Sequence, residues 1–481
     1  MALQALPRPS LPPTRPSPAH PTGLSPLAMV VLLLGAFLPM LDFFIVNLAL
    51  PTIDATLHAS GPMLELIVAG YGTAYAVSLV VGGRLGDAIG RRRMFLIGMA
   101  GFTLTSLLCG IAPSIGVLVA ARVLQGMSAA MIVPQVLATF QATLEGQARS
   151  RAIGLYAATG GIAVVAGQLL GGVLLDADIA GTSWRAIFLV NVPVGIAGLM
   201  LAPRLVPATR SPQPAGVDIP GTALLAVGIV ALLVPLTEGP ALGWPVWLIA
   251  VLALAPLSAA AMIAVERRSE RHGQTPLVPP SLLRVPTVRR GLLLAVPFFL
   301  GFGAFTFVFP LTVQNGLHRD ALQSGLAMTP MAAGFFIGSL LMARLYARYG
   351  TRLLGTGFAL QAVGLVSLIA VLGSQWPDVS LTWTIPGLAL AGFAQALGLG
   401  ALFRTVLASV PQRLAGVGSG VLVTVQQGSL AMGVASLGTL FVSLAADSMR
   451  GAFVVVIGIQ ALLAVVLAVA SPRSANRRSA Q

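Results

Sequence analysis

Apolar residues recur along this chain in fourteen continuous stretches of about 20 residues, the length that a helix needs to cross a bilayer. Because these stretches are continuous and do not alternate with polar residues, they predict helices and argue against the strands of a membrane barrel. Hydrophobic residues make up 56% of the chain and charged residues only 9%, whereas a soluble domain carries about 25% charged residues. We therefore expect an all-α membrane protein whose main partner is the lipid bilayer.

The spans predicted from hydropathy are 27–50, 64–83, 94–113, 115–138, 152–175, 186–203, 221–239, 245–265, 291–315, 324–345, 352–373, 383–405, 416–445 and 451–471. Their number is even, so both termini are expected on the same side of the membrane. Residues 1–26 are polar and rich in proline, and they are expected to form a disordered cytoplasmic tail. Residues 472–481 are expected to form a second cytoplasmic tail. The single cysteine, Cys109, lies in an apolar run and is interpreted as a small buried residue, so no metal site is predicted.

The net charge of +14 comes from 28 basic residues, all of them arginine. Their positions argue against a nucleic-acid partner, because about 24 of them fall in the loops and tails on one side of the predicted spans. This asymmetry predicts that the arginine-rich side faces the cytoplasm, and all five tryptophans fall at the opposite boundary. We expect a multi-pass protein of the cell (inner) membrane with both termini cytoplasmic. The use of arginine alone suggests a high-GC bacterium.

An internal repeat divides the chain. The segment GRLGDAIGRRRM (83–94) follows the second span and ARLYARYGTRLL (343–354) follows the tenth, with Arg-Leu, a glycine and a further arginine in the same order. Two halves of six helices would place these segments six spans apart, but they are eight apart, so two helices are inserted between the halves. The predicted units are two six-helix halves, 27–203 and 291–471, and two inserted helices, 221–265. Weak repeats of this kind are typical of secondary transporters.

Four segments carry a family resemblance: LDFFIVNLALP (41–51), GGRLGDAIGRRR (82–93), ARVLQGMSAAMIVP (121–134) and SWRAIFLVNVPVG (183–195). They resemble, in this order, the first-helix motif, the signature loop, the fourth-helix motif and the entry to the sixth helix in the major facilitator superfamily, specifically its fourteen-helix drug:proton antiporter branch (EmrB/QacA type). The resemblance implies the major facilitator fold and a proton-coupled secondary active exporter of small amphipathic molecules such as drugs or antibiotics. The proton is then the coupling ion and no other cofactor is expected. We expect the chain to act as a monomer.

Two charged residues lie inside predicted spans. Asp42 is about 12 Å from the outer end of the first span, and Arg122 is about 10 Å from the outer end of the fourth. A charge at this depth needs a partner or a water-filled cavity, and the resemblance implies that both helices line a central cavity. We therefore expect Asp42 and Arg122 to take part in proton coupling. The alternatives are a structural aspartate that never titrates and an arginine bonded to backbone carbonyls.

Other residues in the spans are weaker candidates. Glu65, at the outer start of the second span, is either a second proton-coupling carboxyl or a charge favoured by the N-terminal end of the helix dipole. Polar and aromatic residues inside other spans are candidates for contact with substrate: Tyr71, Tyr75, Gln125, Gln395 and Gln426. For the two tyrosines, ordinary packing is the alternative.

The signature-like loop contributes Gly83, Arg84, Gly86, Asp87, Gly90, Arg91 and Arg92. The resemblance implies a conformational latch between the two halves, in which Asp87 bonds an arginine or a helix N-terminus. The alternative is that the arginines serve only to keep the loop in the cytoplasm. The glycines allow close approach of helices and a tight turn.

The fifth span has a face of small residues, Gly167, Gly171 and Gly172, along which helices can touch and slide. It lies in the segment AGQLLGG (166–172), where Gln168 stands in place of the proline usual in the antiporter branch. This departure leaves open whether antiport is altered.

Other classes of function remain. A membrane-embedded enzyme would need metal ligands or a nucleophile with a base, but His20, His58, His272 and His318 are scattered in the tail and loops. ATP-driven transport is disfavoured because the chain has no GxxxxGK[ST] motif. The internal repeat and the buried Asp42 favour a transporter over a channel, although a non-transporting sensor would keep both features. The substrate could be a drug or an endogenous metabolite.

Overall fold

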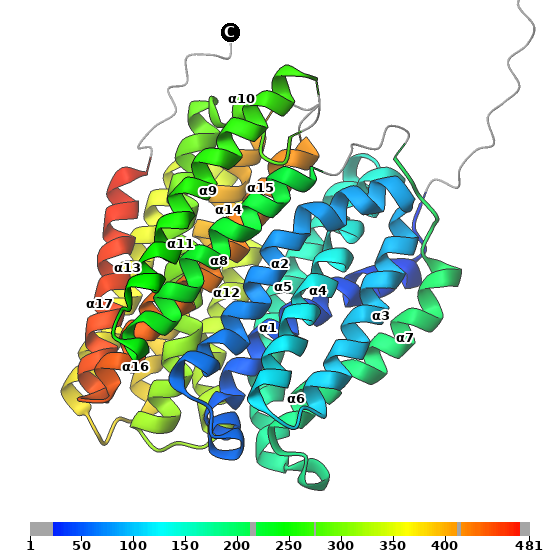
Figure 1. The fold of residues 1–481 in the computed structure, drawn as a ribbon. Coiled ribbons are helices and arrows are strands. Elements are labelled where there is room, and N and C mark those ends of the chain that lie inside the picture. The colour runs from blue at the N-terminus through cyan, green and yellow to red at the C-terminus, as the bar shows by residue number, and fades with distance from the viewer. Residues whose placement is uncertain (1–22, 212–217, 274–275, 411–414, 472–481) are drawn as a thin grey trace, which may run out of the picture.

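The computed structural model describes residues 23–211, 218–273, 276–410 and 415–471. Nearly all of the expected tail 1–26, and the whole of the tail 472–481, lie outside these residues. Within them every regular element is helical, and fourteen helical segments are long and apolar enough to cross a membrane. The helices pack side by side along a common direction (Figure 1). The prediction of an all-α protein with fourteen spans is confirmed.

The first six spans form one group of helices, called here the N-terminal group. Their bounds are α1 Pro26–Leu57, α2 Gly61–Ile89, α3 Arg91–Gly110, α4 Ile115–Thr143, α5 Gly146–Ala177, the short turns η1 Ile179–Gly181 and η2 Ser183–Arg185, and a sixth span broken into α6 Ala186–Leu189 and α7 Asn191–Leu205. Within the group α4 packs on α2 and α3, α5 packs on α1, and α7 packs on α3. The first helix begins where the side chain of Ser25 accepts a hydrogen bond from the backbone N–H of Ala28 and Pro26 takes the first helical position.

The last six spans form the C-terminal group. Their bounds are α10 Pro280–Leu283, α11 Pro286–Leu311 with a π-helical turn η3 Thr312–Gly316, α12 Ala321–Tyr349, α13 Arg352–Gln375, η4 Leu381–Thr384, α14 Ile385–Ala408, α15 Ala415–Gly433 with a π-helical turn η6 Val434–Gly438 and a continuation α16 Thr439–Ala445, and α17 Met449–Ala470. Within this group α14 packs on α12 and α13, α17 on α13, and α15 on α11.

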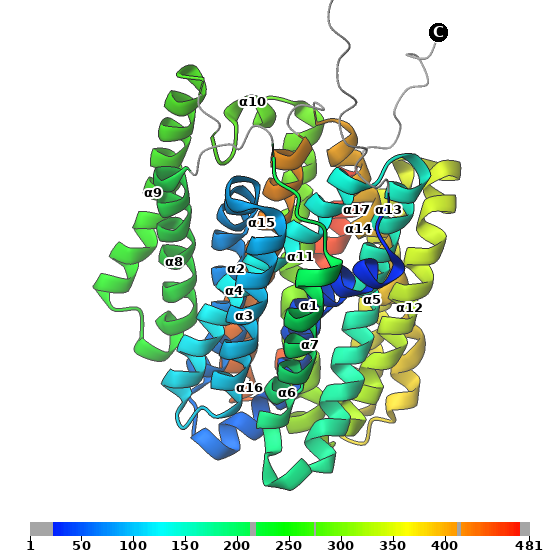
Figure 2. The ribbon, with the colours of Figure 1, turned by 90° about the vertical axis from the view of Figure 1, so that its right-hand side faces the viewer.

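Two further helices, α8 Ile219–Leu242 and α9 Val246–Arg271, lie between the groups in the chain. They pack mainly against each other, and α8 also touches α2. Figure 2 shows the pair standing at one side of the bundle. Large apolar side chains of α9, including Val246 and Leu257, are exposed. In a bilayer such side chains would face lipid.

The two ends of the bundle differ in composition. Both ends of the described chain lie at the end that carries the arginines of 91–93, 267–268 and 289–290, called here the Arg-rich end (Figure 1). The loops with the five tryptophans lie at the opposite end, called here the Trp end. The structure thus has the charge asymmetry that the sequence predicts.

The two groups meet along two pairs of helices, with α2 against α15 and α5 against α12. Near the Trp end the approach is close. A Cβ atom on Gly172 of α5 would lie 2.9 Å from the Cα atom of Leu322 on α12. In the same region the side chain of Gln314 donates a hydrogen bond to the carbonyl of Leu48 on α1 (3.2 Å). The groups are therefore joined at the Trp end in this conformation.

Candidate functional site

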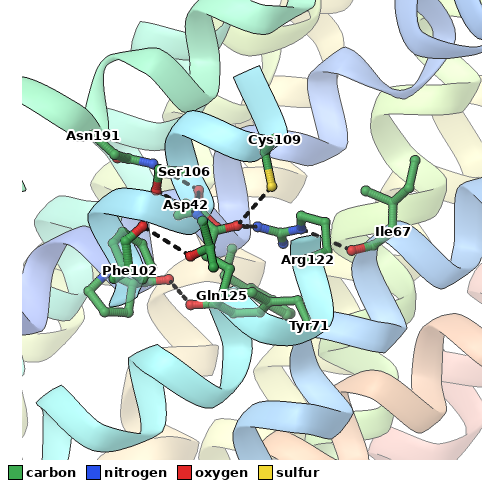
Figure 3. A network of polar contacts seen from close by, with 12 residues as sticks. Asp42, Ile67, Tyr71, Phe102, Ser106, Cys109, Arg122, Gln125 and Asn191 are labelled. Carbon is green, nitrogen blue, oxygen red and sulfur yellow. Dashed lines mark hydrogen bonds and ion pairs between the residues drawn. The ribbon is translucent and has the colours of Figure 1, made fainter. Parts of the chain in front are cut away.

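Asp42 and Arg122 form an ion pair in the interior of the N-terminal group (Figure 3). Asp42 lies in the middle of α1. Arg122 lies on α4, which packs against α1. Arg122 Nη1 donates to Asp42 Oδ2, and both side chains are 0% exposed. The two charges that the sequence places at similar depth are thus direct partners.

A network of amides surrounds this ion pair. Asp42 Oδ1 accepts hydrogen bonds from Gln125 Nε2 (3.0 Å) and from Asn191 Nδ2 (2.9 Å). Gln125 also donates to Ser106 Oγ on α3 (2.8 Å) and accepts from Arg122 Nη1 (2.8 Å). Side chains from four helices, α1, α3, α4 and α7, therefore join in one network around the Asp42 carboxylate, and α3 takes part through Gln125 (Figure 3).

Arg122 is held from other directions as well. Its Nε donates to the backbone carbonyl of Ile67 on α2 (3.1 Å), and its guanidinium lies over the ring of Tyr71. Within the described part of the chain its Nη2 atom has no hydrogen-bond partner. The alternative interpretation, an arginine bonded only to backbone carbonyls, therefore describes one of its contacts and not the others.

Three members of the network were not expected as site residues. Asn191 begins α7, at the break in the sixth span, and it lies inside the segment that resembles the family's entry to the sixth helix. Ser106 lies on α3. Cys109 is buried as predicted, but its thiol also donates to Gln125 Oε1 at 3.6 Å. The sequence signals for Asn191 are its place in that segment and its polar side chain inside an apolar run.

The chemistry open to this network is the binding of one proton. A carboxylate that accepts three hydrogen bonds and faces a permanent cation is stabilised in its charged form, while the loss of water around it opposes that form. Such a group can change its protonation state when its surroundings change. Because neither charge is exposed here, a proton can reach Asp42 only after the helices move. Among the described residues, no three His, Cys, Asp or Glu side chains are placed to hold a metal ion.

Glu65 lies on α2, one turn in from the Trp end, and it is 1% exposed. Its carboxyl contacts the hydroxyl of Thr439 on α16, which belongs to the C-terminal group. Glu65 lies close to the N-terminus of α2, so its role in proton coupling stays a prediction beside the alternative of a charge favoured by the helix dipole. Glu65 is also separate from the Asp42 network.

The signature-like loop holds its charges in two ways. Asp87 pairs with Arg91 (2.9 Å), which is the first residue of α3, so this ion pair joins neighbouring helices of the N-terminal group. Arg84 is buried and its Nη2 donates to the carbonyl of Pro276 (2.6 Å), in the segment that leads into the C-terminal group. In this conformation the link across the molecule is made by Arg84 and not by Asp87. The latch role of Asp87 stays a prediction.

The remaining loop residues support the turn. Arg92 donates to the carbonyl of Pro203 (3.1 Å), in the last turn of α7. Gly90 has φ of 108°, a conformation that side chains rarely adopt. A Cβ atom on Gly86 would overlap the side chain of Gln135 on α4, whose Nε2 donates to the Gly82 carbonyl (2.9 Å). A Cβ atom on Gly83 would lie 3.7 Å from Pro134 Cβ on α4, which is an ordinary contact distance.

The residues proposed to meet substrate are not gathered in one place. Tyr71 is fully buried beneath Arg122, and Tyr75 lies next to it with ring centres 6.2 Å apart. Gln395 is buried and accepts a hydrogen bond from Gln361 (3.0 Å) between α14 and α13. Gln426, on α15, is half-buried. In this conformation the tyrosines pack in the interior, which is the alternative named for them.

The glycine face of α5 divides between two neighbours. Gly167 and Gly171 face α1, where a Cβ atom would lie 3.2 Å from the Leu41 carbonyl oxygen and 3.0 Å from Ile45 Cγ1 respectively. Gly172 faces α12 of the other group. Close approach of helices therefore explains all three glycines, and only Gly172 lies between the groups.

Comparison with known proteins decides the family. The sequence profile of the Major Facilitator Superfamily matches residues 32–434. The chain belongs to the Major Facilitator Superfamily. With fourteen spans it is a superfamily member of the fourteen-helix type, and the resemblance of its motifs is confirmed.

Several relatives in the superfamily are similar over most of this chain. The "Probable actinorhodin transporter" of Streptomyces coelicolor is 36% identical over 418 residues, which are 87% of this chain and 72% of that protein. The "Puromycin resistance protein pur8" of Streptomyces alboniger is 36% identical over 422 residues, 86% of this chain and 81% of that protein. The "Cephamycin export protein CmcT" of Amycolatopsis lactamdurans is 34% identical over 432 residues, 87% of this chain and 85% of that protein.

Solved structures share the fold. A POT family transporter in complex with 5-aminolevulinic acid matches with a TM-score of 0.67 and 13% identity, over 93% of this chain and 96% of that one. The xylose transporter XylE from E. coli, in a partially occluded inward-open conformation, matches with a TM-score of 0.62 and 14% identity, over 91% of this chain and 97% of that one. At these identities the likeness concerns the fold alone.

Proposed function

We propose that this superfamily member is a proton-coupled antiporter that exports small amphipathic molecules, with antibiotics or related metabolites as the substrate class. The names of its relatives support the substrate class, since they include an antibiotic resistance protein and an antibiotic export protein. The observation that carries the proposal is the fully buried ion pair of Asp42 and Arg122. A pair of charges away from water costs free energy, and in a transporter it can serve to bind a proton.

In this proposal, protonation of Asp42 removes the charge attraction that joins α1 to α4. The guanidinium of Arg122 keeps its charge under all physiological conditions. When Asp42 takes up a proton, Arg122 loses its counter-charge and has to seek water or another acceptor. A conformation that gives it one is then favoured, so the proton shifts the population between conformations. Asn191 and Gln125 act as positioning residues that orient the carboxyl.

The proposal also orients the protein. The Arg-rich end lies in the cytoplasm of the cell (inner) membrane, as the positive-inside rule predicts, and the Trp end is the outer end. Both groups of helices and the Asp42 network belong to one chain, so a monomer suffices. The proton is the only coupling ion that the proposal requires, and no cofactor enters it.

The test is transport in proteoliposomes with an imposed pH gradient, followed with a fluorescent amphipathic dye. The expected results are gradient-driven dye movement by the wild type, its loss on addition of a protonophore, and its loss in Asp42→Asn. Asp54→Asn is the matched control, because Asp54 is an exposed carboxyl on the same helix. Normal gradient-driven transport by Asp42→Asn would remove Asp42 from the mechanism. Dye movement that depends neither on the pH gradient nor on the protonophore would overturn proton coupling.

A further inference from the structure

A hydrogen bond at the outer end joins the two groups of helices through an acidic residue. The carboxyl of Glu65, on α2, contacts the hydroxyl of Thr439, on α16, and the two residues are 374 positions apart in the sequence. Glu65 is 1% exposed and Thr439 is 6% exposed, so water is largely excluded from the contact. The bond exists only while the outer ends of the two groups are together.

The hydrogen-bond inventory of Thr439 indicates which partner carries the proton. Its hydroxyl lies 2.8 Å from the carbonyl oxygen of Ala435, one turn earlier, as well as against Glu65. A carbonyl oxygen can only accept, and a hydroxyl has a single proton to donate. Both contacts are fully satisfied when Thr439 donates to Ala435 and accepts from a protonated Glu65. The arrangement therefore suits the neutral carboxylic acid.

The charges around Glu65 favour the same form. Glu238 lies on α8, which packs against α2, and it acts electrostatically on Glu65. It is an acid, and its negative charge opposes a second negative charge nearby. A carboxylate buried without a cation or several donors is costly. Opening the outer end would give the carboxylate water, and this cost would disappear.

The backbone before Thr439 orients its side chain toward the N-terminal group. The residue follows the π-helical turn Val434–Gly438, and the other cross-group donor, Gln314, lies within the π-helical turn Thr312–Gly316. A π-helical turn inserts one extra residue and so rotates the side chains that follow it; such turns are frequent at functional sites. Among the described residues, Gln314 and Thr439 are the polar side chains of the C-terminal group that bond across the outer closure. One meets the Leu48 carbonyl, which cannot titrate, and the other meets Glu65, which can.

We propose that Glu65 is a second proton-binding site, and that its protonated form holds the outer ends of the two groups together through Thr439. Loss of the proton weakens this contact, and opening of the outer end favours loss of the proton, so the two events are linked. In the export cycle of the proposed function, on which this inference rests, a proton taken from outside would close the outer end after substrate has left. The carrier would then return to the cytoplasmic side carrying a proton.

The test measures the outer end directly, without substrate. Spin labels are attached to Ser60→Cys and Asp447→Cys, two exposed positions at the outer ends of α2 and of the segment after α16. The native Cys109 is fully buried, so the labels go to the two new cysteines. Distance distributions are recorded by pulsed electron paramagnetic resonance in lipid nanodiscs, from mildly acidic to mildly alkaline buffer.

The wild type is expected to gain a longer-distance population as the pH rises. Glu65→Gln keeps a donor for Thr439 but cannot ionise, so its distances should stay short at every pH. Thr439→Val removes the hydroxyl at similar volume and should show the longer population even in acidic buffer, while Thr439→Ser should behave as the wild type. An unchanged pH response in Glu65→Gln would overturn the proposal, as would Thr439→Val with wild-type distances.

Two controls separate this inference from the proposed function. Asp54→Asn removes an exposed carboxyl near the same end and should leave the pH response intact. Asp42→Asn is compared in the transport assay alone, because the proposed protonation of Asp42 also shifts the population between conformations. If Asp42→Asn still transports on a pH gradient while Glu65→Gln has lost the distance response, the assignment of Asp42 fails and the role of Glu65 stands. The reverse pair of results would leave Asp42 and reject Glu65.

Discussion

The guanidinium of Arg122 lies over the ring of Tyr71, with its central carbon 4.2 Å from the ring centre. Tyr71 is fixed in turn, because its hydroxyl donates to the carbonyl of Pro39 on α1 (3.0 Å). A cation over an aromatic face gains about 2 kcal/mol when both are desolvated. The ring therefore holds Arg122 from one side while Asp42 holds it from another, and three helices determine where the charge lies.

This geometry predicts that Arg122 cannot be replaced by another cation. The ammonium of Arg122→Lys cannot donate to Asp42, Gln125 and the Ile67 carbonyl from one planar group, so gradient-driven export should fall about tenfold or more. Arg122→Ala leaves a buried carboxylate without its partner, which costs about 3–5 kcal/mol. That variant should lose export and unfold at a lower temperature. Dye transport and thermal unfolding of the purified protein measure both effects.

Arg185→Lys is the matched control for Arg122→Lys. Arg185 also stacks on an aromatic ring, that of Trp184 at 4.5 Å, and donates to the carbonyl of Ala112 (3.2 Å). It lies at the outer end, away from Asp42. Export should therefore stay close to the wild-type rate. Equal losses in the two lysine variants would mean that stacking alone, and not contact with Asp42, sets the effect.

A second prediction concerns Gln168, which stands where the antiporter branch usually has proline. Its side chain is fully buried, its Nε2 lies 3.5 Å from the Phe44 carbonyl, and its Oε1 has no partner among the described residues. A bond of this length is weak, and an unsatisfied buried polar atom costs about 1–3 kcal/mol. Gln168→Leu should therefore unfold at the same temperature or a higher one and keep gradient-driven export. Loss of proton coupling in this variant would show that the amide takes part in antiport.

The sequence was enough to predict the spans and one pair of partners. Each span is a continuous apolar run, so the prediction 186–203 for the sixth span falls within the observed Ser183–Leu205. Depth follows from counting residues at about 1.5 Å each, and this placed Asp42 and Arg122 at the same level. Counting residues gives the depth of each charge without any knowledge of the helix arrangement. The resemblance supplied the expectation that the first and fourth helices line the same cavity.

Depth does not determine which way a side chain points around its helix axis. Asn191 reaches Asp42 because the sixth span breaks just before it, and neither its place in the motif-like segment nor its polarity shows which way it points. Thr439 reaches Glu65 because of a π-helical turn, which no propensity in the sequence predicts. Residues of this kind, whose partners lie far along the chain and depend on a local irregularity, could be found only in the structure.

A third prediction concerns Asp87 in the signature-like loop. Its ion pair with Arg91 is partly exposed, with 38% of the aspartate side chain accessible, so it should contribute no more than about 1 kcal/mol to folding. Asp87→Asn is expected to leave the unfolding temperature and substrate Kd close to wild type and to slow turnover, because the pair joins α2 to α3 at the end that must open to the cytoplasm. Binding and transport are measured on the same preparation, with Asp87→Glu as the conservative variant. Normal turnover together with weaker binding would contradict the latch.

The last prediction tests whether the outer contact between α5 and α12 limits opening. A Cβ atom on Gly172 would lie 2.9 Å from Leu322 Cα and 3.1 Å from the Ala321 carbonyl oxygen. These are backbone atoms of α12, so no side chain can turn aside, and Gly172→Ala should push the start of α12 away from α5. Because the two helices belong to different groups, this displacement should favour the outward-open conformation. The labelled Ser60→Cys and Asp447→Cys pair should then show a longer-distance population at every pH, and export should slow.

Gly154→Ala is the matched control for Gly172→Ala. It lies on the same helix with nothing within 4 Å of an added Cβ atom, so both variants gain the same helix propensity, about 1 kcal/mol, and only one meets an obstacle. Gly154→Ala should keep wild-type distances and export. Gly171→Ala presses on the side chain of Ile45 within the N-terminal group, at 3.0 Å, and should lower stability without opening the outer end. If all three variants gave the same distances, the contact of Gly172 with α12 would not control access from the outer side, and closure there would depend on the Glu65 and Gln314 contacts alone.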